Sequence, residues 1–117
     1  MHRKLATYIR THRRRWGFTQ KELAYLLGIK SGTQVSRYER LQREPQLRVA
    51  LACEVIFGSC PRSLFPQLFS LVEEDVMQRA SQLQQSLEGS MSKVAARKRA
   101  LLNDMLRRAT GINNHAV

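Results

Sequence analysis

The chain has 117 residues, of which 43% are hydrophobic, and its 20 Lys and Arg against 9 Asp and Glu give a formal net charge of +11. This length suits one domain with an appended element and is too short for two ordinary domains. No apolar run approaches the roughly 20 residues of a membrane-spanning helix, and the start has no signal-peptide core, so we expect a soluble, cytoplasmic protein that binds no membrane.

The positive charge lies in two blocks. Residues 1–48 carry 12 basic and 3 acidic side chains, and residues 92–117 carry 6 basic and 1 acidic. The residues between them carry 2 basic and 5 acidic side chains. This distribution predicts a surface for a polyanion and a separate part that packs or self-associates.

The apolar residues of the first part of the chain recur at three- and four-residue spacings, and alternating strand patterns are missing, which predicts an all-α protein. We expect a first helix over residues 3–16. A second helix begins at the capping box Thr19 to Glu22 and ends at Gly28. A second capping box, Ser31 to Gln34, is predicted to open a third helix that runs to about Leu41.

The rest of the chain is predicted to be helical as well. A fourth helix, residues 46–57, is apolar on several sides and should be central. A short helical turn covers residues 61–65, and Pro66 suits the first position of a long helix that reaches residue 88. A last helix covers residues 92–109.

The segment from residue 19 to 38 has the pattern of a helix-turn-helix. Small Ala24 lies where the two helices cross, a glycine lies at the turn, and Leu27, Val35 and Tyr38 lock the pair at a steep angle. On these residues the chain resembles the phage repressor and Cro family of regulators, often called Xre-like, over about residues 3–65. The matching motifs are Phe-Thr-Gln-Lys-Glu-Leu-Ala at 18–24, Leu-Gly-Ile at 27–29, Val-Ser-Arg-Tyr-Glu-Arg at 35–40 and Pro-Gln-Leu at 45–47.

Members of that family bind operator DNA as dimers, with the third helix in the major groove, and the resemblance implies the same here. We therefore predict a five-helix repressor-type helix-turn-helix domain over residues 1–65, a two-helix C-terminal extension over residues 66–110 and a flexible tail at 111–117. The recognition helix is placed at about residues 32–41. The chain departs from the family at two places. The segment from Gly28 to Val35 is one residue longer than the commonest family turn, and Leu41 stands where family members often have glycine.

The third helix offers polar side chains that can read base edges, because Arg can pair with guanine and Gln with adenine. The predicted base contacts are Thr33, Gln34, Ser36 and Arg37. The resemblance implies that Gln20 hydrogen-bonds a phosphate and braces the recognition helix. By charge and placement, the other predicted phosphate contacts are Lys21, Lys30, Arg40 and Arg43. The resemblance also implies that Arg13 pairs with Glu39 and ties the first helix to the third. Taken singly, most of these side chains could instead be solvated.

The C-terminal helices carry long apolar stripes that a small globule cannot bury, which predicts a homodimer. The predicted dimerisation residues are Leu68, Leu71, Val72, Val76, Leu83, Val94, Leu101, Leu102 and Met105. The alternative is a separate protein partner on these helices, as for an antitoxin or another interaction module on the same fold.

No arrangement in the sequence is typical of catalysis, a metal site or a cofactor, so we predict none of these. The acidic run Glu73 to Asp75 is expected to be a solvated helix face, because successive helical residues diverge by ~100°. Cys53 and Cys60 are expected to be buried free thiols.

Overall fold

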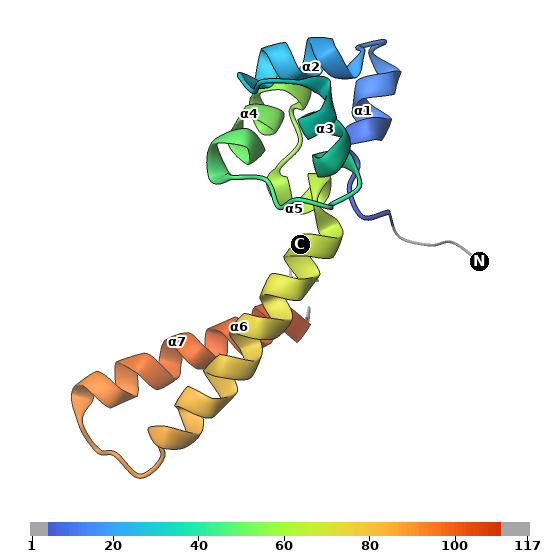
Figure 1. Cartoon of the computed structure of the whole chain (residues 1–117). Helices are drawn as coiled ribbons and strands as arrows, with labels where there is room; N and C mark the ends of the chain where they lie inside the picture. Colours follow the sequence, from blue (N-terminus) through green and yellow to red (C-terminus); the bar gives the residue numbers. More distant parts are fainter. Residues whose placement is uncertain (1–4, 111–117) are drawn as a thin grey trace. The chain divides into compact units, whose positions relative to one another are not determined.

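A computed structural model describes residues 5–110 of the chain, and this part contains seven helices and no strand, so the all-α prediction is confirmed. The helices are α1 (Ile9–Arg15), α2 (Gln20–Leu27), α3 (Gly32–Glu39), α4 (Leu47–Phe57), α5 (Pro61–Leu64), α6 (Pro66–Ser86) and α7 (Lys93–Thr110) (Figure 1). The chain divides into two compact units, Met1–Ser70 and Leu71–Val117. The predicted tail, residues 111–117, lies outside the described residues.

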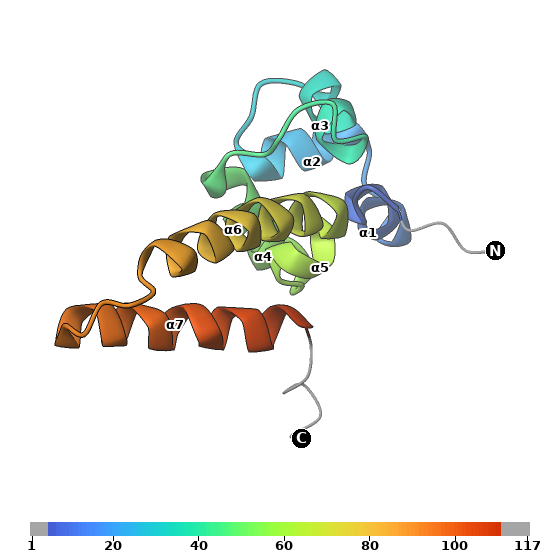
Figure 2. The ribbon, with the colours of Figure 1, turned by 90° about the horizontal axis from the view of Figure 1, so that it is seen from below.

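The first unit has a hydrophobic core to which α1 to α5 all contribute. In Figures 1 and 2 these helices gather around it, with α2 and α3 forming the helix-turn-helix pair. The buried core side chains are Ile9, Leu23, Ala24, Leu27, Val35, Tyr38, Val49, Ala50, Cys53, Leu64 and Phe65. The predicted inner faces of the second and third helices are therefore confirmed.

The first helix is shorter than predicted and begins at Ile9. The preceding backbone is tied to distant elements, because the amide of Tyr8 donates to the carbonyl oxygen of Leu64 at 2.8 Å. The buried hydroxyl of Thr7 donates to the carbonyl oxygen of Glu39 at 2.9 Å and accepts from the amide of Ile9 at 3.4 Å. These tertiary hydrogen bonds replace those of an additional helical turn.

The capping box at the start of α2 is confirmed. The amide of Glu22 donates to the hydroxyl oxygen of Thr19 at 3.0 Å, and the amide of Thr19 donates to the Glu22 carboxylate at 2.9 Å. The helix ends where Gly28 adopts a left-handed conformation, with φ of 74°. This geometry suits glycine because it lacks a Cβ.

The second predicted capping box, at the start of α3, is wrong. The side chain of Ser31 makes no capping hydrogen bond, and the amide of Gln34 donates instead to the Ser31 carbonyl oxygen at 3.2 Å. The helix also ends at Glu39, before the predicted Leu41, because Leu41 has a positive φ of 54° that no right-handed helix can continue.

Helix α4, which we predicted to be central because it is apolar on several sides, contributes one buried face to the core and leaves other apolar side chains exposed. Val49, Ala50 and Cys53 are buried. Leu47 and Val55, which lie two turns apart, are 73% and 84% exposed. Cys60 is exposed at the N-cap position of α5, so the prediction of two buried thiols holds for Cys53 alone.

The second unit contains most of α6 and all of α7, joined by a turn at residues 87–92 (Figure 1). Its described residues include only three fully buried hydrophobic side chains, Ala80, Ala95 and Leu102. Polar contacts connect the helices: Gln84 Nε2 donates to Asn103 Oδ1 at 2.7 Å, and Arg99 donates to the Leu87 carbonyl oxygen at 2.8 Å. This unit therefore has a very small core of its own.

Candidate nucleic-acid interface

Helix α3 has a buried side and a polar outer side. Val35 and Tyr38 point into the core. Thr33 and Arg37 are exposed, as is Arg40 directly after the helix, and their spacing places all three on one outer line. Gln34 and Ser36 are half-buried at the two margins of this line. The four predicted base-contacting residues thus lie on the outward side of one helix or at its edge.

A hydrogen bond between residues one helical turn apart holds the side chain of Arg40 on this outer line. Arg40 Nη2 donates to the hydroxyl oxygen of Ser36 at 2.6 Å. The Arg40 guanidinium keeps its other donors free for an external acceptor. Its place among the phosphate contacts stays a prediction.

Gly32 fixes how closely α3 approaches α2. A Cβ atom at this position would lie 3.1 Å from the Cβ of Gln20 and 3.2 Å from the backbone nitrogen of Lys21. The first turn of α3 therefore rests directly on the first turn of α2. Gly32 faces α2, and Thr33 is the first outward residue of the helix.

A buried carboxylate joins α3 to α1 and α2. Arg13 Nε donates to Glu39 Oε2 at 2.5 Å, and Gln20 Nε2 donates to Glu39 Oε1 at 3.1 Å. Arg13 also donates to the carbonyl oxygen of Phe18 at 2.9 Å, and both charged residues are 8% exposed. The structure therefore places Arg13 and Glu39 together, and it adds Gln20 and Phe18 to the cluster, which we call the Glu39 clamp.

Gln20 braces the end of α3, as the family resemblance implies, because its amide nitrogen donates to Glu39. Its predicted contact with a phosphate stays a prediction. The buried Thr7 hydroxyl holds the carbonyl group of the same Glu39. Sequence reasoning missed Thr7, because nothing in the local pattern distinguishes it from a solvated threonine.

The remaining predicted phosphate contacts are exposed around α3. Lys21 lies in the first turn of α2, Lys30 in the turn before α3, and Arg43 in the segment after it. The described residues form no ion pair with any of the three. Their charges are thus available to a polyanion from three separate segments.

The predicted dimerisation residues fall into two groups. Leu68 packs against the core of the first unit, and Leu102 is buried within the second, so we remove both from the expected interface because a single chain already covers them. Met105 is half-buried. Those that stay substantially exposed are Leu71, Val72, Val76, Leu83, Val94 and Leu101.

Residues 5–110 also bear on two other kinds of site, membrane spans and metal sites. No helix in this range is long and apolar enough to cross a membrane. The same residues form no group of three or more His, Cys, Asp and Glu side chains that could hold a metal ion. Glu74 and Asp75 of the acidic run are exposed, and Glu73 is half-buried.

Comparison with known proteins connects this geometry to a family. Residues 9–65 match a family model described as helix-turn-helix, which spans α1 to α5. Searches of curated proteins and of solved structures gave no match. The matched segment contains the Glu39 clamp, the capping box of α2 and the whole of α3. Residues 9–65 therefore belong to the helix-turn-helix family of the phage repressor and Cro type, a family of DNA-binding regulators.

Proposed function

We propose that the protein is a cytoplasmic transcriptional regulator that binds a palindromic operator as a dimer, with α3 in the major groove. The observation that carries this proposal is the Glu39 clamp, which holds α3 so that Thr33 and Arg37 face outward. The Arg37 guanidinium can donate to both acceptors of guanine. Thr33, Gln34 and Ser36 lie on the same side or at its edge and can complete the base contacts.

The charge around α3 supports a polyanionic partner. Lys21, Lys30, Arg40 and Arg43 surround the helix and are all exposed. Residues 1–48, which contain them, have a net charge of +9. These side chains bind phosphates in the proposed complex, while Gln20 acts mainly by bracing α3.

The second unit supports a homodimer. Val72, Val76 and Leu83 form an exposed apolar stripe on α6, beside the position of buried Ala80. Val94 and Leu101 form a corresponding stripe on α7, seven residues apart. Two helices that bury so few of their own apolar side chains gain stability when a second copy covers these stripes.

The alternative occupant of the stripes is a separate protein, as in an antitoxin-like module. The same exposed apolar side chains favour it. The two alternatives differ in the mass of the purified chain, because only self-association produces a dimer without another protein. Sedimentation of the purified chain separates them, because it measures that mass.

A binding titration tests the DNA-binding proposal. A duplex selected from a random pool and an unrelated duplex of equal length are titrated with the full chain at several salt concentrations. If about 6 phosphates are neutralised, the slope of log K against log salt is about −5. Absent or salt-insensitive binding contradicts the proposal.

Two variants separate base reading from phosphate binding. We expect Arg37→Ala to lose ~1 to 3 kcal/mol of discrimination between the two duplexes. Lys30→Ala is the control, because a lost phosphate contact weakens binding to both duplexes alike. Equal losses on both duplexes for Arg37→Ala would remove its reading role.

A further inference from the structure

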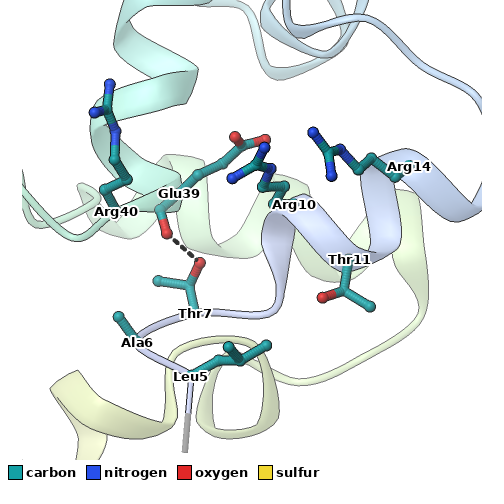
Figure 3. Close-up of a pocket in the computed structure, with 8 residues that line it drawn as sticks. All are labelled: Leu5, Ala6, Thr7, Arg10, Thr11, Arg14, Glu39 and Arg40. Atoms are coloured by element: carbon teal, nitrogen blue, oxygen red, sulfur yellow. Dashed lines mark hydrogen bonds between the residues drawn. The ribbon is translucent and has the colours of Figure 1, made fainter.

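A cleft of about 500 Å³ lies between the segment at residues 5–7, helix α1 and the end of α3 (Figure 3). Arg10 and Arg14 enter its wall from α1, and Arg40 enters from the end of α3. Arg10 and Arg14 are four residues apart and therefore share one side of α1. The guanidinium groups of Arg10 and Arg14 thus lie on one side of the cleft, whereas that of Arg40 is hydrogen-bonded to Ser36 and points away from them in Figure 3.

The positive charge of this cleft is not neutralised by the protein. Glu39 is the one carboxylate in its lining, and its oxygens are already held by Arg13 and Gln20. In the described part of the chain neither Arg10 nor Arg14 forms an ion pair. Two like charges on one side of a cleft, with the charge of Arg40 at its edge, attract an anion from outside.

We propose that this cleft binds a phosphate group at Arg10 and Arg14, with Arg40 at its edge toward α3. Guanidinium groups suit this ligand because their planar donors match phosphate oxygens. Arg40 also lies on the outer line of α3, so the backbone of the duplex that α3 binds is the phosphate source that the geometry favours. In this form the inference rests on the proposed function and extends the DNA footprint to α1. A free phosphorylated compound would supply the same chemistry.

The DNA arm of the test compares single-charge variants of one helix. Arg10→Gln and Arg14→Gln each remove one charge from the cleft, and Arg15→Gln removes one charge from the same helix outside the lining. We expect each cleft variant to bind the selected duplex about tenfold more weakly at 0.1 M salt, and its salt slope to fall by up to about 1. Arg15→Gln should change both quantities much less.

The second arm uses inorganic phosphate without DNA. Calorimetry at low salt should show saturable binding to the wild-type chain and to Arg15→Gln, and weaker binding to Arg10→Gln and Arg14→Gln. Loss of phosphate binding with unchanged DNA affinity supports the cleft and assigns it to a free phosphorylated compound. If the chain binds phosphate through these arginines but no duplex, the site stands and the proposed function fails.

Two further measurements distinguish a lost charge from a disturbed fold. Arg10→Lys keeps the positive charge and should keep most of the salt slope, so it distinguishes lost charge from a disturbed fold. The thermal midpoint of each variant is measured alongside, and we expect no change because Arg10 and Arg14 are exposed. If the cleft variants match Arg15→Gln in both arms, the cleft binds no phosphate and the proposal is overturned.

Discussion

Glu39 is the residue that connects α3 to the rest of the first unit. Its carboxylate accepts hydrogen bonds from Arg13 on α1 and Gln20 on α2, and its carbonyl oxygen accepts one from Thr7. A buried ion pair contributes little net stability when both partners are present, because desolvation offsets the attraction. Removing one partner leaves the other as a buried charge without compensation.

We predict that Glu39→Ala lowers the free energy of unfolding by ~3 to 5 kcal/mol, because Arg13 then stays buried without its carboxylate. Urea denaturation followed by circular dichroism measures the change. Glu44→Ala is the matched control, since Glu44 is exposed in the segment after α3 and should change stability very little. Equal stability of the two variants would contradict the role of the clamp.

The two cysteines should differ in reactivity. Burial raises the pKa of the Cys53 thiol to about 12, whereas a hydrogen bond with Ser63 lowers the pKa of exposed Cys60. Because the thiolate is the reactive form, we predict that iodoacetamide at pH 8 modifies the native chain once, at Cys60. Mass spectrometry should find a second adduct, at Cys53, only after denaturation. Rapid modification of Cys53 in the native protein would contradict the packing of α4.

At the scale of elements, the contact between α2 and α3 depends on a missing Cβ atom. We predict that Gly32→Ala lowers the free energy of unfolding by about 1 to 3 kcal/mol, because the added methyl group meets the Cβ of Gln20 at 3.1 Å and the backbone of residues 20 and 21 at 3.2 to 3.3 Å. The displaced α3 should also bind the selected duplex more weakly. Thr33→Ala, one residue later on the exposed side, is the stability control. A Gly32→Ala chain as stable as this control would show that the two helices can move apart without a loss in the free energy of unfolding.

The sequence predicted those helix boundaries that depend on hydrogen bonds between neighbouring residues. The α2 capping box could be read directly, because both of its hydrogen bonds lie within four residues. The start of α1 could not, since it depends on a bond from Tyr8 to Leu64. For α4, a sequence that is apolar on several sides does not indicate which side other helices cover.

The candidate site shows the same division. The outward residues of α3 follow from helical spacing, and the resemblance to the repressor family indicated Arg13 with Glu39. The Arg10 and Arg14 cleft was not foreseen, because periodicity does not tell which side of α1 lies beside the end of α3. The resemblance indicated that Gln20 braces the recognition helix, but its partner, Glu39, depends on the tertiary approach of α2 to α3.

At the scale of the whole molecule, the second unit determines the expected assembly. We predict that Leu83→Glu and Leu101→Glu each weaken the dimer in sedimentation experiments, because a carboxylate on an apolar stripe must be desolvated on association. We also expect a clear loss of affinity for the operator and a smaller loss in the free energy of unfolding of the first unit. Gln82→Glu is the control, since it adds the same charge on α6 at an exposed polar position.

Truncation after Gly89 is the complementary test of the dimer, because it removes α7 as a whole. A truncated chain that stays fully dimeric would confine the interface to the residues before the cut. A full-length chain that sediments as a monomer would contradict the homodimer and favour a separate protein partner for the stripes.

The Glu39 clamp has a consequence for how a duplex would be selected. Because α3 is held from both α1 and α2, the helix keeps one orientation before DNA arrives, and its backbone loses little conformational entropy on binding. Any misfit must then be absorbed by the duplex, which bends and twists more easily at some base steps than at others. We therefore expect base pairs that no side chain touches to influence affinity through the stiffness of the DNA.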